Sequence, residues 1–420
     1  MTSVKPGARN RNPKRMYNSF PKVARNSMTA RVFLAFLTTA GLFYVNIMPT
    51  IVSGLKEALN FTNQEAGNVG SANMYGAAVG ALLIVFLVKR INWQLAATLF
   101  LTVLISIDLA STQLTNPQTM IVVRFLHGFF GGMLVGLGFS LIGRTSQPDR
   151  TFGVLLFVQY GLGGLGIMFI PGLVPEFGTQ ILFYSLITFS VVTFLMMPFL
   201  PKYEVITDLS DEIALDSSTQ HSSPRLLKLP IILTLTSIFL FQGANMGLFA
   251  FIIGLGEHYS LQLDFITTTL GIANWLGLAG AGLVIAIGSK FGYLRPLLAG
   301  IVITATTIWA LLYSNVPWIW IVSNCMVGVT WAFTISYLLG LMSRFDASGQ
   351  MSALGGFASK MGLASGPMVT AFVLGDDDYA RVIYISAAIV LVTFISIWIP
   401  ARMQDQKLLK TNADRPELNP

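Results

Sequence analysis

The sequence predicts an all-α integral membrane protein of twelve transmembrane helices, arranged as two pseudo-symmetric six-helix bundles. Three observations support this prediction: a very apolar composition, apolar stretches of membrane-spanning length, and a repeat that relates the two halves of the chain. Hydrophobic residues make up 54% of the 420 residues and charged residues only 11%, whereas a soluble domain carries about 25% charged residues. A chain of this composition needs lipid as part of its solvent.

The apolar residues are grouped into stretches that match the length of a membrane-spanning helix. A helix that rises about 1.5 Å per residue needs about 20 residues to cross a hydrocarbon core of about 30 Å. The stretches are continuously apolar, whereas the strands of a membrane barrel would alternate in hydrophobicity. In order along the chain, the predicted spans are residues 33–55, 66–88, 94–113, 118–143, 151–174, 179–200, 229–255, 265–288, 294–314, 317–342, 350–375 and 380–401.

Basic residues follow the even-numbered spans, and this pattern predicts the orientation of the helices. Lys89 and Arg90 follow the second span and Lys290 follows the eighth, whereas the other connections contain few basic residues. Lys and Arg mark the cytoplasmic side because they resist translocation. We therefore expect both termini in the cytoplasm, as an even number of spans requires. A basic arm and a compact chain without a sorting signal favour a bacterial inner membrane.

The two halves of the chain share a pattern of residues at an offset of about 200 positions. Matching positions include Gly70, Asn73, Gly76 and Lys89 with Gly271, Asn274, Gly277 and Lys290, and Gly128, Arg144 and Gly166 with Gly328, Arg344 and Gly366. Six helices followed by six similar helices indicate a parallel duplication. We predict a basic cytoplasmic arm over residues 1–31, a first bundle over 32–200, a cytoplasmic linker over 201–228, a second bundle over 229–401 and a cytoplasmic tail over 402–420.

The polar segments outside the spans indicate contact with lipid rather than with nucleic acid. The predicted arm contains eight Lys or Arg residues and no acid, and a cationic segment beside a membrane attracts anionic lipid headgroups. We expect membrane lipids as partners and no nucleic acid. The one cysteine, Cys325, excludes a disulfide within the chain, and we expect neither a metal site nor a cofactor. No nucleotide-binding loop is present, so direct coupling to ATP is not expected.

Several glycine-containing motifs resemble those of the major facilitator superfamily. Residues 124–131, Arg-Phe-Leu-His-Gly-Phe-Phe-Gly, are similar to the family's fourth-helix motif of an Arg followed by glycines. Residues 288–295 resemble the family's loop motif, whereas residues 89–92, at the corresponding place in the first half, lack its Asp. Residues 161–171 and 362–367 are similar to its fifth-helix motif of Gly and Pro. The resemblance covers about residues 31–401 and implies a secondary transporter that works by alternating access.

Small residues recur at four-residue spacing in two of the predicted spans. This spacing lets helix backbones approach closely in a membrane, where no hydrophobic driving force brings helices together. We expect these residues to lie between packed helices. They are Ala72, Gly76 and Gly80 in the second span, and Gly128, Gly132, Gly136 and Ser140 in the fourth.

Lys360 lies near the middle of the eleventh span, where a charge costs on the order of 3 kcal/mol unless it faces a partner or water. It matches Tyr160 in the repeat, so we expect both side chains to face a cavity. One hypothesis is that Lys360 contacts the negative group of a substrate. The alternative is a lysine held by helix carbonyl groups.

Three further ionisable residues lie in the third and fourth spans. Asp108 and Arg124 are at similar depths in helices joined by a short turn, so we expect them to pair. His127 is one helical turn from Arg124, and an unperturbed pKa of about 6.5 suits proton coupling. We leave two interpretations open: a structural ion pair with a hydrogen-bonded histidine, or a proton-coupling site formed by these three residues.

Neutral polar side chains complete the predicted substrate site. Each of them lies on a helix that lines the central cavity in similar proteins, although an interhelical hydrogen bond is the alternative role. These residues are Tyr44, Asn46, Gln159, Tyr160, Gln242, Asn245, Asn324 and Trp331.

The sequence favours a proton-linked carrier of a small organic metabolite, and an anionic one, because Lys360, Arg124 and His127 outnumber the single embedded acid, Asp108. The alternative is broad efflux of lipophilic drugs, which 30 Phe and 17 Met residues favour because they form adaptable apolar walls. An enzyme is not expected, because no paired acid and base or set of metal ligands is recognisable. A receptor would not explain the duplication. We expect a monomer.

Overall fold

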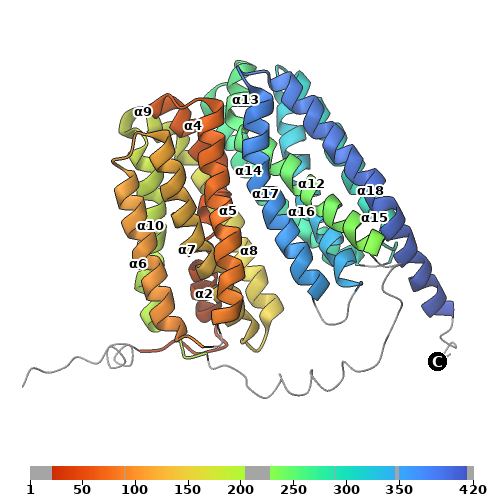
Figure 1. Ribbon diagram of the computed structural model, residues 1–420, viewed down its shortest axis with the longest axis horizontal. Helices are drawn as coiled ribbons and strands as arrows, with labels where there is room; N and C mark the ends of the chain where they lie inside the picture. Colours follow the sequence, from red (N-terminus) through yellow and green to blue (C-terminus); the bar gives the residue numbers. More distant parts are fainter. Residues whose placement is uncertain (1–20, 89, 204–227, 289, 346–349, 414–420) are drawn as a thin grey trace, which may run out of the picture.

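The computed structural model describes residues 21–413 except 89, 204–227, 289 and 346–349, and these residues form helices and no strand. Figure 1 shows two helical bundles side by side, one from each half of the chain. Most of the predicted linker and residues 1–20 of the predicted arm lie outside the described residues. The prediction of an all-helical protein is confirmed.

The first bundle begins at Met28 and ends at Phe199. Its helices are α2 (Met28–Ala40), α3 (Phe43–Asn46), α4 (Met48–Leu59), α5 (Asn63–Leu87), α6 (Trp93–Ser111), α7 (Pro117–Gly143), α8 (Pro148–Phe169), η1 (Pro171–Leu173), α9 (Val174–Phe177), α10 (Gln180–Met196) and η2 (Met197–Phe199). Thr62 and Glu65 form a capping box that starts α5. The Asn116 side chain caps α7, which has Pro117 at its first position.

The second bundle repeats this order of helices. It contains α12 (Lys228–Ala250), α13 (Ile252–His258), α14 (Leu263–Ile287), α15 (Leu294–Ala310), η3 (Leu311–Tyr313), α16 (Pro317–Ser343), α17 (Gln350–Leu374) and α18 (Tyr379–Ala413). Residues 402–413 of the predicted tail continue α18 instead of leaving it. The Asp405 carboxylate explains this extension, because it accepts the backbone N–H groups of Tyr293 at 2.6 Å and Leu294 at 3.1 Å, where α15 begins.

Eleven helices of the described chain are long and apolar enough to cross a membrane. They account for all the predicted spans except the first. The predicted first span differs from expectation because it is divided into α2, α3 and α4. Pro49 explains the break at Ile47, since proline has no N–H to donate to the carbonyl of Val45. The predicted seventh span is likewise divided, with α12 and α13 separated at Phe251.

The helix of the first span begins earlier than predicted. The Ser27 side chain caps α2, so the helix of this span begins at Met28 and not after residue 31. The N–H of Val23 donates to the carbonyl of Phe199 at 3.0 Å, and Lys22 Nζ donates to the carbonyl of Pro198 at 2.5 Å. These contacts hold residues 22–27 against the end of the first bundle.

Helices α5 and α7 pack through the small residues that the sequence singled out. A methyl group added at Gly76 or Gly80 of α5 would overlap backbone atoms of α7, and one added at Gly128 or Gly132 of α7 would overlap backbone atoms of α5. The prediction of close helix packing is therefore confirmed at these positions. Such an approach fixes the depth at which polar side chains of α5 and α7 meet.

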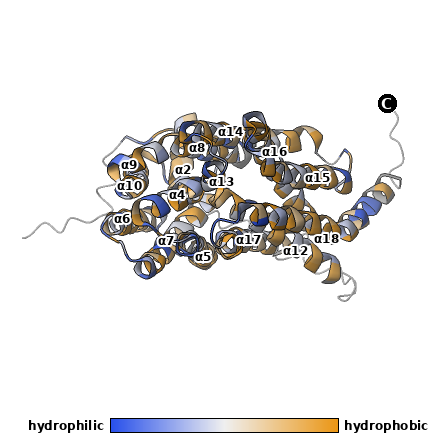
Figure 2. Ribbon diagram, turned by 90° about the horizontal axis from the view of Figure 1, so that it is seen from above, coloured by the Kyte–Doolittle hydropathy of each residue, from blue (hydrophilic) through white to orange (hydrophobic). Residues whose placement is uncertain are grey.

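The two bundles touch each other mainly through α5 with α17 and α8 with α14. Figure 1 shows the start of α2 and the end of α18 on one face of the molecule, which we call the terminal face; the other end is the opposite face. Figure 2 shows α5 beside α17 and α8 beside α14. Ser71 Oγ accepts the N–H of Met368 at 2.9 Å, and the hydroxyl groups of Tyr75 and Ser365 are 2.7 Å apart. Near the opposite face, Asn63 donates to the carbonyl of Gly375 at 2.8 Å.

Candidate functional site: a polar cavity between the bundles

A cavity of about 210 Å³ lies between the two bundles. Helices α3 and α8 of the first half and α12, α13, α14, α16 and α17 of the second half contribute to its wall. None of the described residues that line it is an Asp, Glu, Lys, Arg or His, so the wall is polar but uncharged. Its polar side chains are Asn46, Gln159, Tyr160, Gln242, Asn245, Asn274, Asn324 and Trp331.

Seven of the nine residues predicted to bind substrate line this cavity, and Tyr44 and Lys360 do not. Tyr44 is 1% exposed and lies inside the first bundle. Lys360 is one helical turn from Leu363, which does line the cavity. Within the described chain, Lys360 forms no hydrogen bond or ion pair. The match in the repeat predicted a shared environment for Tyr160 and Lys360, but only Tyr160 lines the cavity.

Two groups of cavity side chains bind each other. Gln159 Nε2 donates to Asn46 Oδ1 at 3.0 Å, and Asn46 Nδ2 donates back to the carbonyl of Gln159 at 3.2 Å, which joins α8 to α3. Gln242 Nε2 donates to Ser359 Oγ at 2.7 Å, while Gln242 Oε1 accepts from Trp331 Nε1 at 2.5 Å. The second group joins α12, α16 and α17. These bonds give the wall a fixed shape.

Three asparagines turn their amide oxygens away from the backbone. Asn245 Nδ2 donates to the carbonyl of Phe241 at 2.8 Å, and Asn324 Nδ2 donates to that of Trp320 at 2.9 Å. Asn274 Nδ2 donates across the halves to a carbonyl of α8 at 3.3 Å. Because a carbonyl oxygen only accepts, each amide must present its NH₂ group to the backbone. Asn245 Oδ1 is buried without a partner in the described structure, so one acceptor on a residue of the cavity wall is unused.

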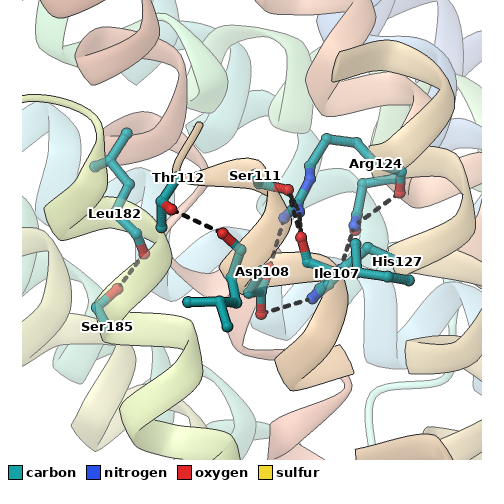
Figure 3. Close-up of polar contacts among 10 residues, drawn as sticks. Ile107, Asp108, Ser111, Thr112, Arg124, His127, Leu182 and Ser185 are labelled. Carbon is teal, nitrogen blue, oxygen red and sulfur yellow. Dashed lines mark hydrogen bonds and ion pairs between the residues drawn. The ribbon is translucent and has the colours of Figure 1, made fainter. Parts of the chain in front are cut away.

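The predicted pair of Asp108 and Arg124 is confirmed, and it lies inside the first bundle. Arg124 Nη1 donates to Asp108 Oδ1 at 2.8 Å, and both side chains are fully buried. Arg124 also donates to the hydroxyl of Ser111. His127 Nε2 lies 3.2 Å from Asp108 Oδ2, so a single carboxylate faces two basic side chains (Figure 3). We call Asp108, Arg124 and His127 the buried ionic cluster.

Asn73 fixes which nitrogen of His127 carries the proton. Asn73 Nδ2 donates to the carbonyl of Arg124 at 3.2 Å and lies 2.8 Å from His127 Nδ1. Since the amide NH₂ is the donor, His127 Nδ1 accepts, and the proton of a neutral imidazole is on Nε2, facing Asp108. These contacts give Asn73 a structural role between α5 and α7.

Helix α3 connects the buried ionic cluster to the cavity. The Tyr44 ring lies 5.8 Å from the His127 ring and 6.0 Å from the Arg124 guanidinium carbon. The next two residues, Val45 and Asn46, line the cavity. One four-residue helix therefore contacts the cluster with one residue and the cavity with the following two.

The sequence analysis missed two side chains that complete these networks. Ser359 holds Gln242 in the cavity wall; its position beside Lys360 was the available signal. Ser111 binds Arg124 and lies one turn after Asp108, a spacing that places both on one face of α6.

Comparison with known proteins assigns the family. The family model described as Major Facilitator Superfamily matches residues 32–367. The chain therefore belongs to the major facilitator superfamily and is a membrane transporter. No curated protein sequence matches it.

Solved structures share the fold at low sequence identity. A crystal structure of a mutant of the nucleoside transporter NupG has a TM-score of 0.73 and 14% identity, covering 88% of this chain and 98% of that one. A crystal structure of a D-xylose-proton symporter has a TM-score of 0.69 and 14% identity, covering 88% of this chain and 97% of that one. At this identity the likeness defines the fold alone.

Proposed function

We propose that the protein carries a small, uncharged organic solute rich in hydrogen-bond donors, by alternating access between the two bundles. The observation that carries this proposal is the cavity wall, where Asn245, Asn274 and Asn324 direct amide oxygens away from the backbone. Hydroxyl or N–H groups of a solute would satisfy these acceptors, and the Trp331 and Tyr160 rings provide apolar surface. The solutes named for the two similar structures, a nucleoside and D-xylose, are of this chemical class.

The cavity favours an uncharged solute over the anion expected from the sequence. That expectation counted Arg124 and His127 as available charges, but both lie against Asp108 inside the first bundle. Amide oxygens repel an anion, and no basic residue is among the described lining residues. The lipophilic cation of the drug-efflux alternative would likewise meet no carboxylate there.

We also propose that the buried ionic cluster couples transport to protons. Asp108 shares its charge between Arg124 and His127, so a proton taken up by His127 changes the balance of charge inside the bundle. Tyr44 contacts both basic side chains, and its neighbour Asn46 lines the cavity. A solute that binds Asn46 and shifts α3 would therefore alter the surroundings of the cluster.

Thermal stability of the detergent-purified protein tests the solute class. A ligand that binds the folded state alone stabilises it by about 2.7 kcal/mol at a concentration about 100 times its Kd. We expect stabilisation by members of a panel of nucleosides and sugars, and none by organic anions or lipophilic cations. Asn245→Leu should abolish the effect, because it removes the unpartnered acceptor.

Asn68→Ala is the matched control, since it removes an amide from α5 that does not line the cavity. It should retain the full stabilisation. Stabilisation by organic anions, unchanged in Asn245→Leu and lost in Lys360→Met, would contradict the proposal and restore the anion hypothesis. Stabilisation by lipophilic cations would instead favour efflux.

A further inference from the structure

A second pocket, of about 270 Å³, lies between the bundles near the opposite face. Helix α4 of the first half packs against α13 of the second half there, as Figures 1 and 2 show. The pocket is separate from the polar cavity described above and shares none of its lining residues. It is lined by Val52, Ser53, Lys56, Glu57, Ala250, Phe251, Gly254, Glu257 and Tyr379.

Two carboxylates in this pocket come from corresponding helices of the two halves, α4 and α13. Glu57 and Glu257 are 200 residues apart, and each lies in the last turn of its helix. The helices also end alike, because Asn60 and Ser260 have φ values of 54° and 59°. The negative end of a helix dipole disfavours a carboxylate, so both acids stand where an anion is unfavourable.

An unpartnered hydroxyl group points into the same pocket. Tyr379 is 3% exposed, lines the pocket and has no hydrogen-bond partner in the described part of the chain. Its hydroxyl lies over Gly254, where a side chain would overlap it. Lys56 Nζ, 3.5 Å from Asp377 Oδ1, supplies a cation from the first half. A buried hydroxyl of this kind can donate to a carboxylate or a carboxylic acid.

Both acids are exposed side chains with a raised pKa. Partial burial raises the pKa of Glu57. Burial is also the largest cause that raises the pKa of Glu257; the charge of Glu57 raises it further, and Lys56 opposes the shift. Since the two carboxylates belong to different bundles, their repulsion exists only while this end of the molecule is closed.

We propose that Glu57 and Glu257 form a proton-binding site whose occupation favours closure of the two bundles at the opposite face. Closure brings the two carboxylates together, and a bound proton removes one of the two like charges. Opening separates them and releases the proton. This site acts on closure at the opposite face, which we call the gate. Its role depends neither on the identity of the transported solute nor on the buried ionic cluster.

The direction of the pH dependence follows from proton linkage. A group whose pKa is higher in the closed state stabilises that state at low pH, and the effect is lost as pH rises through the closed-state pKa. With one proton bound on closure, the ratio of closed to open molecules changes by at most about tenfold per pH unit. The other charged or titratable groups near the pair are Lys56 on α4, His258 on α13, Asp377 before α18, and Tyr379 on α18.

A distance measured across the gate tests the proposal without any solute. Spin labels at Phe177→Cys in α9 and Tyr313→Cys in η3 report the separation of the bundles, because both positions are exposed. Cys325→Ser removes the native thiol. The full-length protein in lipid nanodiscs is titrated from about pH 4.5 to about pH 8, and the open fraction is measured at each step.

We expect the open fraction to rise with pH in the unsubstituted chain. Glu57→Gln and Glu257→Gln should each flatten this dependence, and the double variant should stay closed at all pH values, since Gln resembles the protonated acid. Asp264→Asn, which removes an exposed acid in the first turn of α14, is the matched control and should retain the dependence. A pH-independent distance in the unsubstituted chain overturns the proposal, as does a dependence that persists in the double variant.

Discussion

Removal of Asp108 should destabilise the protein more than removal of its partner Arg124. Asp108→Leu leaves the guanidinium of Arg124 in a fully buried site without its carboxylate, and the loss of one partner of a buried ion pair costs about 3–5 kcal/mol. Arg124→Met leaves the carboxylate 3.2 Å from His127, which remains beside it as a basic partner. We expect a smaller loss for that variant, about 1–3 kcal/mol.

The double variant Asp108→Leu with Arg124→Met should recover part of the stability lost in Asp108→Leu, because no unpaired charge remains in the bundle. Equilibrium unfolding in mixed micelles with a rising fraction of sodium dodecyl sulfate measures all three. Ser106→Ala is the control, since this exposed hydroxyl on α6 bonds only to the carbonyl of Thr102. Losses that simply add in the double variant would show that the two charges do not interact, and would refute the reasoning.

Three further predictions concern packing, Lys360 and proton coupling. Gly128→Val should reduce the yield of folded, monodisperse protein and cost about 1–3 kcal/mol or more, whereas Gly143→Val, with open space around it, should not. Lys360→Met should change the affinity for the stabilising solute by less than about twofold in a binding titration, because Lys360 does not line the cavity. His127→Gln should abolish the dependence of proteoliposome uptake on a proton gradient; a coupling unchanged in this variant would exclude His127 as the coupling group.

The sequence predicted the helices well because hydrophobic length is a property of each segment alone. It did not predict the division of the first span, although Pro49 was visible, because many membrane helices retain their course at a proline. The end of α18 was also placed too early. Asp405 contacts the start of α15, more than 100 residues away in the sequence. The composition of the tail alone does not indicate such a contact.

The site residues were predicted unevenly for a related reason. Seven of the predicted neutral polar residues line the cavity, because helices of this family's fold present their inner faces to one cavity. Tyr44 and Asn46 differ by two positions, or about 200° around a helix, so one faces the bundle interior and the other the cavity. The charge count behind the anion hypothesis could not distinguish a charge facing the cavity from one already paired inside a bundle.

Residues at matching positions of the sequence repeat can make different contacts in the structure. Asn73 holds His127 inside the first bundle, whereas Asn274 reaches across to α8 and lines the cavity. This difference arises because α5 meets the buried ionic cluster. The described part of the second half has no such cluster, since the residues around Gly328, which matches Gly128 in the repeat, are uncharged. Glu57 and Glu257 instead have the same chemistry on corresponding helices of the two halves, and both line one pocket. A pair of acids that meets across the two halves senses the separation of the bundles directly. The two halves together create such a site, and neither half contains it alone.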